Sequence, residues 1–186
     1  MKKILIGVSA PNNKTTQAAI AQLSEVFTLN HLNMRQPMIN MIAALTEIDK
    51  TAQEFYCPQD YIIDHLGISI EQLEISLSLT LRTFKKDFYI NHCADALAHA
   101  RRGYLGHLFS GQIISGIKTE LEAQWIREQG GQMVHIYQYT DACYHHPLNE
   151  IQGDLVCVID QPSNTPDTRE LIQNLRSKIY PTKQAA

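Results

Sequence analysis

Short apolar runs and longer amphipathic stretches alternate along the chain and predict its first elements. Residues 2–8, KKILIGV, read as a short apolar run, which is typical of a strand covered on both faces. Residues 15–28 place apolar side chains at helical spacing. Pro37 opens a second helical stretch that runs to about residue 48, because proline is well tolerated in the first turn of a helix.

The middle of the chain, from Pro58 to about Arg102, has helical spacing throughout. The first segment there ends near Gly67, and the next begins with Ser69-x-x-Gln72, which has the form of a capping box. The last segment stops at Gly103, because glycine commonly follows the end of a helix. The pattern therefore predicts a helical insertion at about residues 50–105.

The pattern changes after residue 105 to shorter alternating units. It predicts strands at 111–117, 132–139 and 153–160, with helices at 119–131 and 165–179. A strand–helix opening, a helical insertion and this closing part indicate an α/β fold. We expect one domain, residues 1–186, with a mostly parallel sheet flanked by helices.

Composition excludes several classes of protein. The 186 residues suit one domain, and a net charge of −3 gives no basic excess for a nucleic-acid or membrane partner. No apolar run reaches the ~18 residues that span a bilayer. The four cysteines are widely spaced without a CxxC pair, which favours a reduced, cytoplasmic protein.

The stretch GVSAPNNKTT, residues 7–16, occupies the place of a phosphate-binding loop between a strand and a helix. The glycine positions of GxxxxGK[ST] fall on Val8 and Asn13, so we expect anion binding without the usual enclosure of a triphosphate. Thr15 supplies the hydroxyl expected at a metal. From residue types alone, the alternative that Asn13 or Thr15 merely caps the helix is the simpler interpretation. The candidate phosphate-binding residues are Gly7, Asn12, Asn13, Lys14, Thr15 and Thr16.

Residues 114–136, ISGIKTELEAQWIREQGGQMVHI, closely resemble ISDVRFPNEAEAIRKLGGKVIRV in phage-type deoxynucleoside monophosphate kinases. Residues 35–48 and 145–175 are similar to further segments of that family in the same order. The resemblance implies a three-layer P-loop kinase fold, ATP and Mg²⁺ as cofactors, a deoxynucleoside monophosphate (dNMP) as substrate, and a phage or prophage setting. It implies catalytic roles for Lys14, Arg82 and Lys118, and substrate contacts by Arg35, Arg82, Glu122 and Glu150.

The chain departs from the family where phosphate and metal are handled. Gly116 and Lys118 stand in place of the acidic residue and the arginine of ISDVR, and Ile39 replaces a basic residue. A glycine cannot hold a metal-bound water, and lysine lacks the bidentate fork of arginine. We therefore expect a dNMP kinase-like protein whose phosphoryl transfer from ATP is weakened or lost.

Other interpretations remain open at this point. The protein could be a non-catalytic nucleotide- or protein-binding member of the fold, with a homodimer as one option. It could also be a kinase that has rebuilt its phosphate site around Lys118. Arg82 could instead lie on a solvated helix face.

Overall fold

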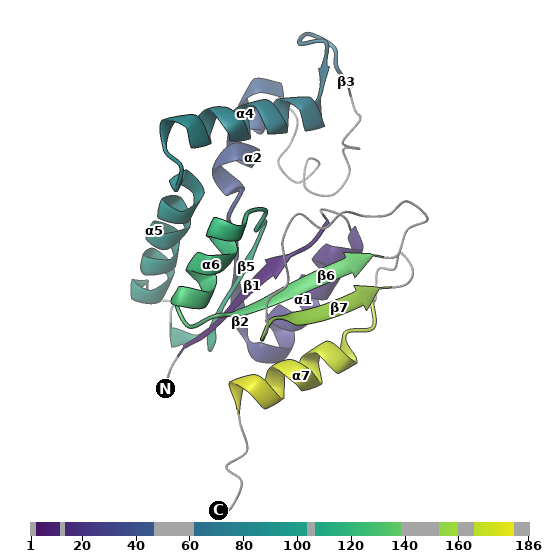
Figure 1. Ribbon diagram of the computed structural model, residues 1–186, viewed down its shortest axis with the longest axis vertical. Helices are drawn as coiled ribbons and strands as arrows, with labels where there is room; N and C mark the ends of the chain where they lie inside the picture. Colours follow the sequence, from purple (N-terminus) through teal and green to yellow (C-terminus); the bar gives the residue numbers. More distant parts are fainter. Residues whose placement is uncertain are drawn as a thin grey trace, which may run out of the picture.

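The computed structural model describes residues 3–11, 14–46, 62–103, 107–138, 153–159 and 166–180. A five-stranded sheet lies at its centre in the order β2-β5-β1-β6-β7 (Figure 1), and each neighbouring pair in it is parallel. The strands are β1 (Ile4–Ser9), β2 (Leu29–Asn33), β5 (Gly111–Ser115), β6 (Gln132–Gln138) and β7 (Leu155–Ile159).

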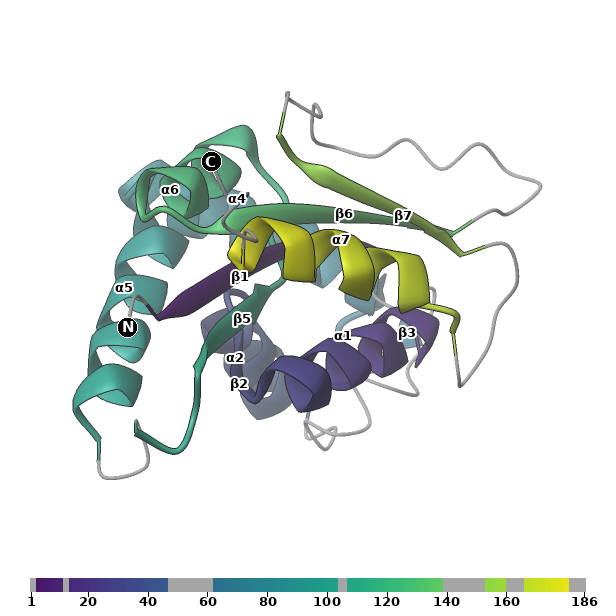
Figure 2. The same cartoon turned by 90° about the horizontal axis from the view of Figure 1, so that it is seen from below.

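Helices cover both faces of this sheet. Side chains of α1 (Lys14–Phe27) and α7 (Arg169–Ile179) share one buried cluster with Ile6 and Val8 of β1. Figure 2 shows these two helices on the same side of the sheet. Leu5 points to the opposite cluster, which α2 (Gln36–Thr46), α4 (Ile70–Phe84), α5 (Phe88–Arg102) and α6 (Glu120–Glu128) build. The predicted α/β fold is thus confirmed, and it is compatible with a three-layer P-loop-like arrangement.

Two local predictions in the insertion, the capping box at Ser69 and the helix end at Gly103, are also confirmed. Ser69 Oγ accepts a hydrogen bond from the Gln72 amide at 3.1 Å, and the Gln72 side chain accepts one from the Ser69 amide at 3.0 Å. The predicted capping box therefore starts α4. At the end of α5, the Gly103 amide donates to the carbonyl of His99 at 2.8 Å.

The helix predicted up to Gly67 is wrong over residues 62–67. Two short strands, β3 (Ile62–Ile63) and β4 (Ile68–Ser69), pair antiparallel there. Gly67 has φ +65°, a left-handed conformation that glycine adopts without a steric penalty. The chain therefore turns at Gly67, and the helix begins only at the Ser69 cap.

The sequence pattern did not predict β2. Among the described strands, β2 pairs with β5 alone and is an edge strand, and its sequence LNHLN is largely polar. An edge strand buries fewer side chains than a central one, so it leaves no apolar run in the sequence. Its position matters, because the residues that follow it enter the candidate site.

None of the described helices is long and apolar enough to cross a bilayer.

Candidate functional site

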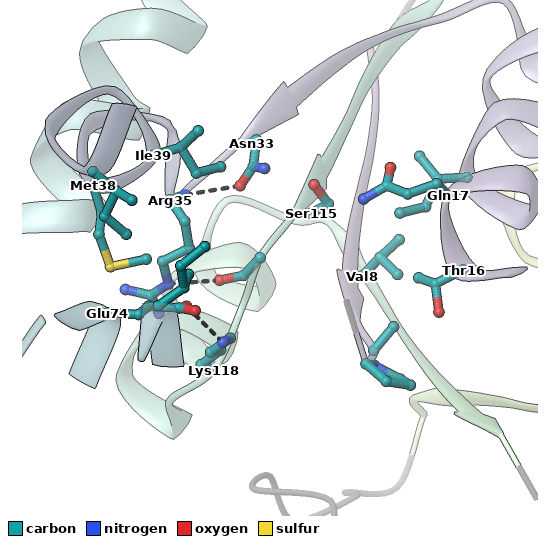
Figure 3. Close-up of a pocket in the computed structure, with 16 residues that line it drawn as sticks. Val8, Thr16, Gln17, Asn33, Arg35, Met38, Ile39, Glu74, Ser115 and Lys118 are labelled. Atoms are coloured by element: carbon teal, nitrogen blue, oxygen red, sulfur yellow. Dashed lines mark hydrogen bonds and ion pairs between the residues drawn. The ribbon is translucent and has the colours of Figure 1, made fainter. Parts of the chain in front are cut away.

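A cleft opens where the chain leaves two adjacent central strands in opposite directions. After β1 the chain enters α1 on one face of the sheet, and after β5 it enters α6 on the other. Such a topological switch point, at the carboxyl ends of parallel strands, is where open α/β sheets bind ligands. The cleft is lined by Val8, Ala10, Pro11, Thr16, Gln17, Ile20, Asn33, Arg35, Met38, Ile39, Ile42, Ile70, Glu74, Ser115, Gly116 and Lys118 (Figure 3).

The cleft combines an apolar wall with a few polar groups. Met38, Ile39 and Ile42 come from α2, and Ile70 comes from the start of α4. The cavity volume of the cleft is about 80 Å³, and the rest of the space between these residues opens to solvent. Sites for small molecules place a small number of polar groups on such an apolar wall. The cleft therefore has the chemical character of a small-molecule site, with a small enclosed volume.

Arg35 is the most deeply buried charged group of this lining, with 4% of its side chain exposed. Its amide donates to Asn33 Oδ1 at 2.9 Å, which fixes the turn between β2 and α2. Its Nε donates to the carbonyl of Gly116 at 2.9 Å, and its Nη2 donates to Glu122 Oε2 at 2.5 Å. Nη1 is buried and has no hydrogen-bond partner among the described residues. A buried donor without a partner is costly, so a ligand oxygen that reached Nη1 would satisfy it.

The carboxylate of Glu122 both binds Arg35 and caps the first turn of α6. It forms a capping box with Thr119, and its Oε2 also accepts from the Lys118 amide at 2.9 Å. Its Oε1 accepts from Arg82 Nη2 at 3.2 Å. Two guanidinium groups thus share one carboxylate. The resulting Arg35–Glu122–Arg82 cluster carries one net positive charge.

An aromatic ring supports the two arginines. The guanidinium carbons of Arg35 and Arg82 lie 4.0 and 5.3 Å from the centroid of the Tyr89 ring. The face of such a ring attracts cations, which helps to keep both side chains in place.

Burial, with a further contribution from the charge of Glu122, raises the pKa of Cys93 in the same core to about 12. This thiol is therefore neutral at physiological pH and is not a nucleophile.

Gly116 closes the turn after β5 and has no room for a side chain. Its φ is +77°, and an added Cβ would lie 2.7 Å from Asn33 Oδ1 and 3.1 Å from Arg35 Cγ. A larger residue at position 116 would therefore have a strained backbone and would have to displace Asn33 or Arg35.

Lys118 and Glu74 form an ion pair at the side of the cleft. The distance from Lys118 Nζ to Glu74 Oε1 is 3.0 Å, and the side chains are 42% and 21% exposed. Figure 3 shows this pair beside Arg35, on the side of the cleft opposite Gln17 and Thr16. Both residues line the cleft, so an entering anion meets a lysine and a carboxylate together.

The structure brings together about half of the residues predicted for the site. Arg35, Lys118 and Thr16 line the cleft, and Glu122 and Arg82 complete the charged cluster with Arg35. The arginine at position 82 is thus engaged with Glu122 rather than lying on a solvated face.

The predicted phosphate loop contributes less. Lys14 is exposed at the start of α1 and Thr15 is buried in its first turn, and neither is among the residues that line the cleft. Gly7 lies inside β1, where an added Cβ would lie 2.6 Å from Met133 Sδ, so close packing accounts for this glycine. Asn12, Asn13 and Glu150 lie outside the described residues.

Sequence reasoning missed four polar residues of the cleft: Gln17, Asn33, Glu74 and Ser115. Asn33 ends β2 and Ser115 ends β5, so correct ends for both strands would have placed both residues at the carboxyl edge. Glu74 has no such signal, because its partner Lys118 is 44 residues away in the sequence.

Comparison of the chain with models of known protein families gives no match, and neither does comparison with curated proteins. Among the described residues, no group of three or more His, Cys, Asp or Glu side chains could hold a metal ion. The resemblance to dNMP kinases and the ATP and Mg²⁺ it implies therefore stay predictions.

Proposed function

We propose that this chain is a dNMP kinase-like protein that binds a nucleoside monophosphate in the cleft of Figure 3 and has weakened or lost phosphoryl transfer from ATP. The observation that carries the proposal is Arg35. This guanidinium is held rigidly at the carboxyl edge of the sheet, lines the cleft and keeps a buried Nη1 without a partner among the described residues.

A phosphate monoester fits this arrangement. Arginine binds phosphate through charge-assisted hydrogen bonds, and its geometry here is fixed before a ligand arrives. Lys118 adds a second cation near the same space. The apolar wall of Met38, Ile39 and Ile42 offers a surface for a base and sugar. The cations and carboxylates around the cleft leave one net positive charge; they are Arg35, Arg82, Lys118, Glu74 and Glu122.

The described residues fit MgATP poorly. Phosphoryl transfer depends on positioning and on neutralising charge, for which kinases use bound Mg²⁺. Gly116 supplies no carboxylate at the end of β5, and Val8 stands where a phosphate loop has a glycine. The Thr15 hydroxyl, predicted at the metal, is not part of the lining. These features support binding of the monophosphate without efficient transfer.

The second candidate is a non-catalytic protein that binds a nucleotide or another protein, with a homodimer as one option. The same glycine favours it, because a left-handed residue packed against Asn33 and Arg35 cannot be replaced by an acid without rearrangement. The nucleotide-binding form of this second candidate uses the same cleft and differs from the first only in having no phosphoryl transfer.

Replacing Lys118 by methionine is expected to weaken dNMP binding about fivefold to tenfold, since a cation beside the phosphate is lost while the aliphatic stem remains. The measurement is titration calorimetry with each of the four dNMPs. Lys86→Met is the matched control, because Lys86 is exposed and outside the cleft. Equal affinities for the two variants would contradict binding at this cleft.

A further inference from the structure

One carboxylate of the cleft has no obvious purpose in a site for anions. Glu74 lies on α4, lines the cleft and pairs with Lys118 at 3.0 Å. Figure 3 shows its carboxylate directed at the Lys118 ammonium. Glu71, one turn earlier on the same helix, is exposed and outside the cleft, so the position of Glu74 is specific to the site.

The placement of α4 keeps Glu74 at this point. Arg82, eight residues further along α4, contacts Glu122, while Glu74 contacts Lys118. On α4, Glu74 supplies a carboxylate and Arg82 supplies a guanidinium. The segment at the start of α6 supplies the ammonium of Lys118 and the carboxylate of Glu122. Two ion pairs of opposite polarity hold α4 against the start of α6. Moving Glu74 away from the cleft would therefore break its ion pair with Lys118.

Glu74 also sets the charge that a ligand meets. With it, the charged residues around the cleft sum to one net positive charge; without it, they would sum to two. Arg35 Nη1 is buried and has no hydrogen-bond partner among the described residues, so a first phosphate group that reached it would satisfy it. A second or third phosphate group would need the remaining cation, Lys118, which Glu74 already occupies.

Building on the proposed function, we propose that Glu74 is a specificity-determining residue that makes the cleft select nucleoside monophosphates over di- and triphosphates. Specificity is a difference between two affinities, and a like charge placed against the wrong ligand is an effective way to create it. Each added phosphate group brings further negative charge toward the Glu74 carboxylate, in a partly buried site where charges interact more strongly than in water. A monophosphate reaches Arg35 with Lys118 beside it, and its single phosphate group brings the least negative charge toward Glu74.

The test compares Glu74→Gln with the wild-type protein by titration calorimetry in EDTA. The probes are dTMP, dTDP and dTTP, with dGMP, dGDP and dGTP in parallel. The ratio of the triphosphate Kd to the monophosphate Kd is expected to fall about tenfold in the variant, equivalent to about 1.4 kcal/mol. Glu71→Gln removes the same charge from the same helix and is expected to keep the wild-type ratio, as is Glu74→Asp, which preserves the carboxylate.

The ratio separates selectivity from a merely structural effect, because a loosened α4 would weaken all three phosphates of a series alike. A wild-type protein that binds a monophosphate, with an unchanged ratio in Glu74→Gln, would overturn the role of Glu74 and leave the proposed function standing. A wild-type protein that binds none of these six nucleotides and neither of the other two dNMPs would overturn both.

Discussion

Replacing Glu122 by glutamine is expected to lower the free energy of unfolding by about 3–5 kcal/mol, the usual cost of removing one partner from a buried ion pair. The carboxylate is 4% exposed and accepts hydrogen bonds from Arg35, Arg82 and two backbone amides. Glutamine keeps the shape of the side chain but leaves two guanidinium groups without a counter-charge. The loss of the counter-charge is most costly for Arg35, because its side chain is as deeply buried as that of Glu122.

Denaturation by urea measures this loss, and Glu120→Gln provides the matched control. Glu120 lies in the same first turn of α6 and pairs with Arg127, but its side chain is 48% exposed. Exposed pairs contribute about 0–1 kcal/mol, so the control is expected to change stability by no more than that. A Glu122→Gln variant as stable as the control would contradict the claim that this carboxylate holds the site together.

Replacing Gly116 by alanine is expected to cost about 2–4 kcal/mol, the sum of a left-handed backbone penalty and overpacking. The φ of +77° is unfavourable for any residue with a Cβ, and that atom would lie 2.7 Å from Asn33 Oδ1. Relief requires Asn33 or the adjacent Arg35 to move. The variant is therefore also expected to weaken dNMP binding.

Gly67→Ala separates the two contributions. Gly67 has a similar φ of +65°, but an added Cβ would have no heavy atom within 4 Å. This variant is expected to lose only the backbone part, about 1–2 kcal/mol, and to bind dNMP normally. Thermal or urea unfolding of both variants provides the comparison. Equal losses would show that Gly116 is not crowded against the site.

The fold was predictable wherever burial leaves a periodic trace in the sequence. The central strands β1 and β5 and the amphipathic helices gave clear patterns, and the Ser69 capping box gave the start of α4. The edge strand β2 and the hairpin of β3 and β4 left no such trace. Their conformations depend on pairing with distant residues and on a left-handed Gly67, which periodicity does not report.

The site was less predictable, because its contacts join residues far apart in the sequence. Arg35 and Glu122 are 87 residues apart, and only a family resemblance brought both to attention. The sequence contained Gly116 in place of an acid, but its conformation explains why no side chain fits there. The position of Glu74 in the cleft could not be predicted from the sequence. A glutamate on a helix is usually a surface residue, and only the structure shows its ion pair with Lys118.

Calorimetric titration of the wild-type protein with the four dNMPs and with ATP, each with and without Mg²⁺, tests the proposed function most directly. We expect at least one dNMP to bind with a Kd below about 1 mM, a free energy more favourable than about −4.1 kcal/mol. This binding should not depend on Mg²⁺, and ATP should bind more weakly under both conditions. Tight ATP binding that strengthens with Mg²⁺, or no heat with any dNMP, would contradict it.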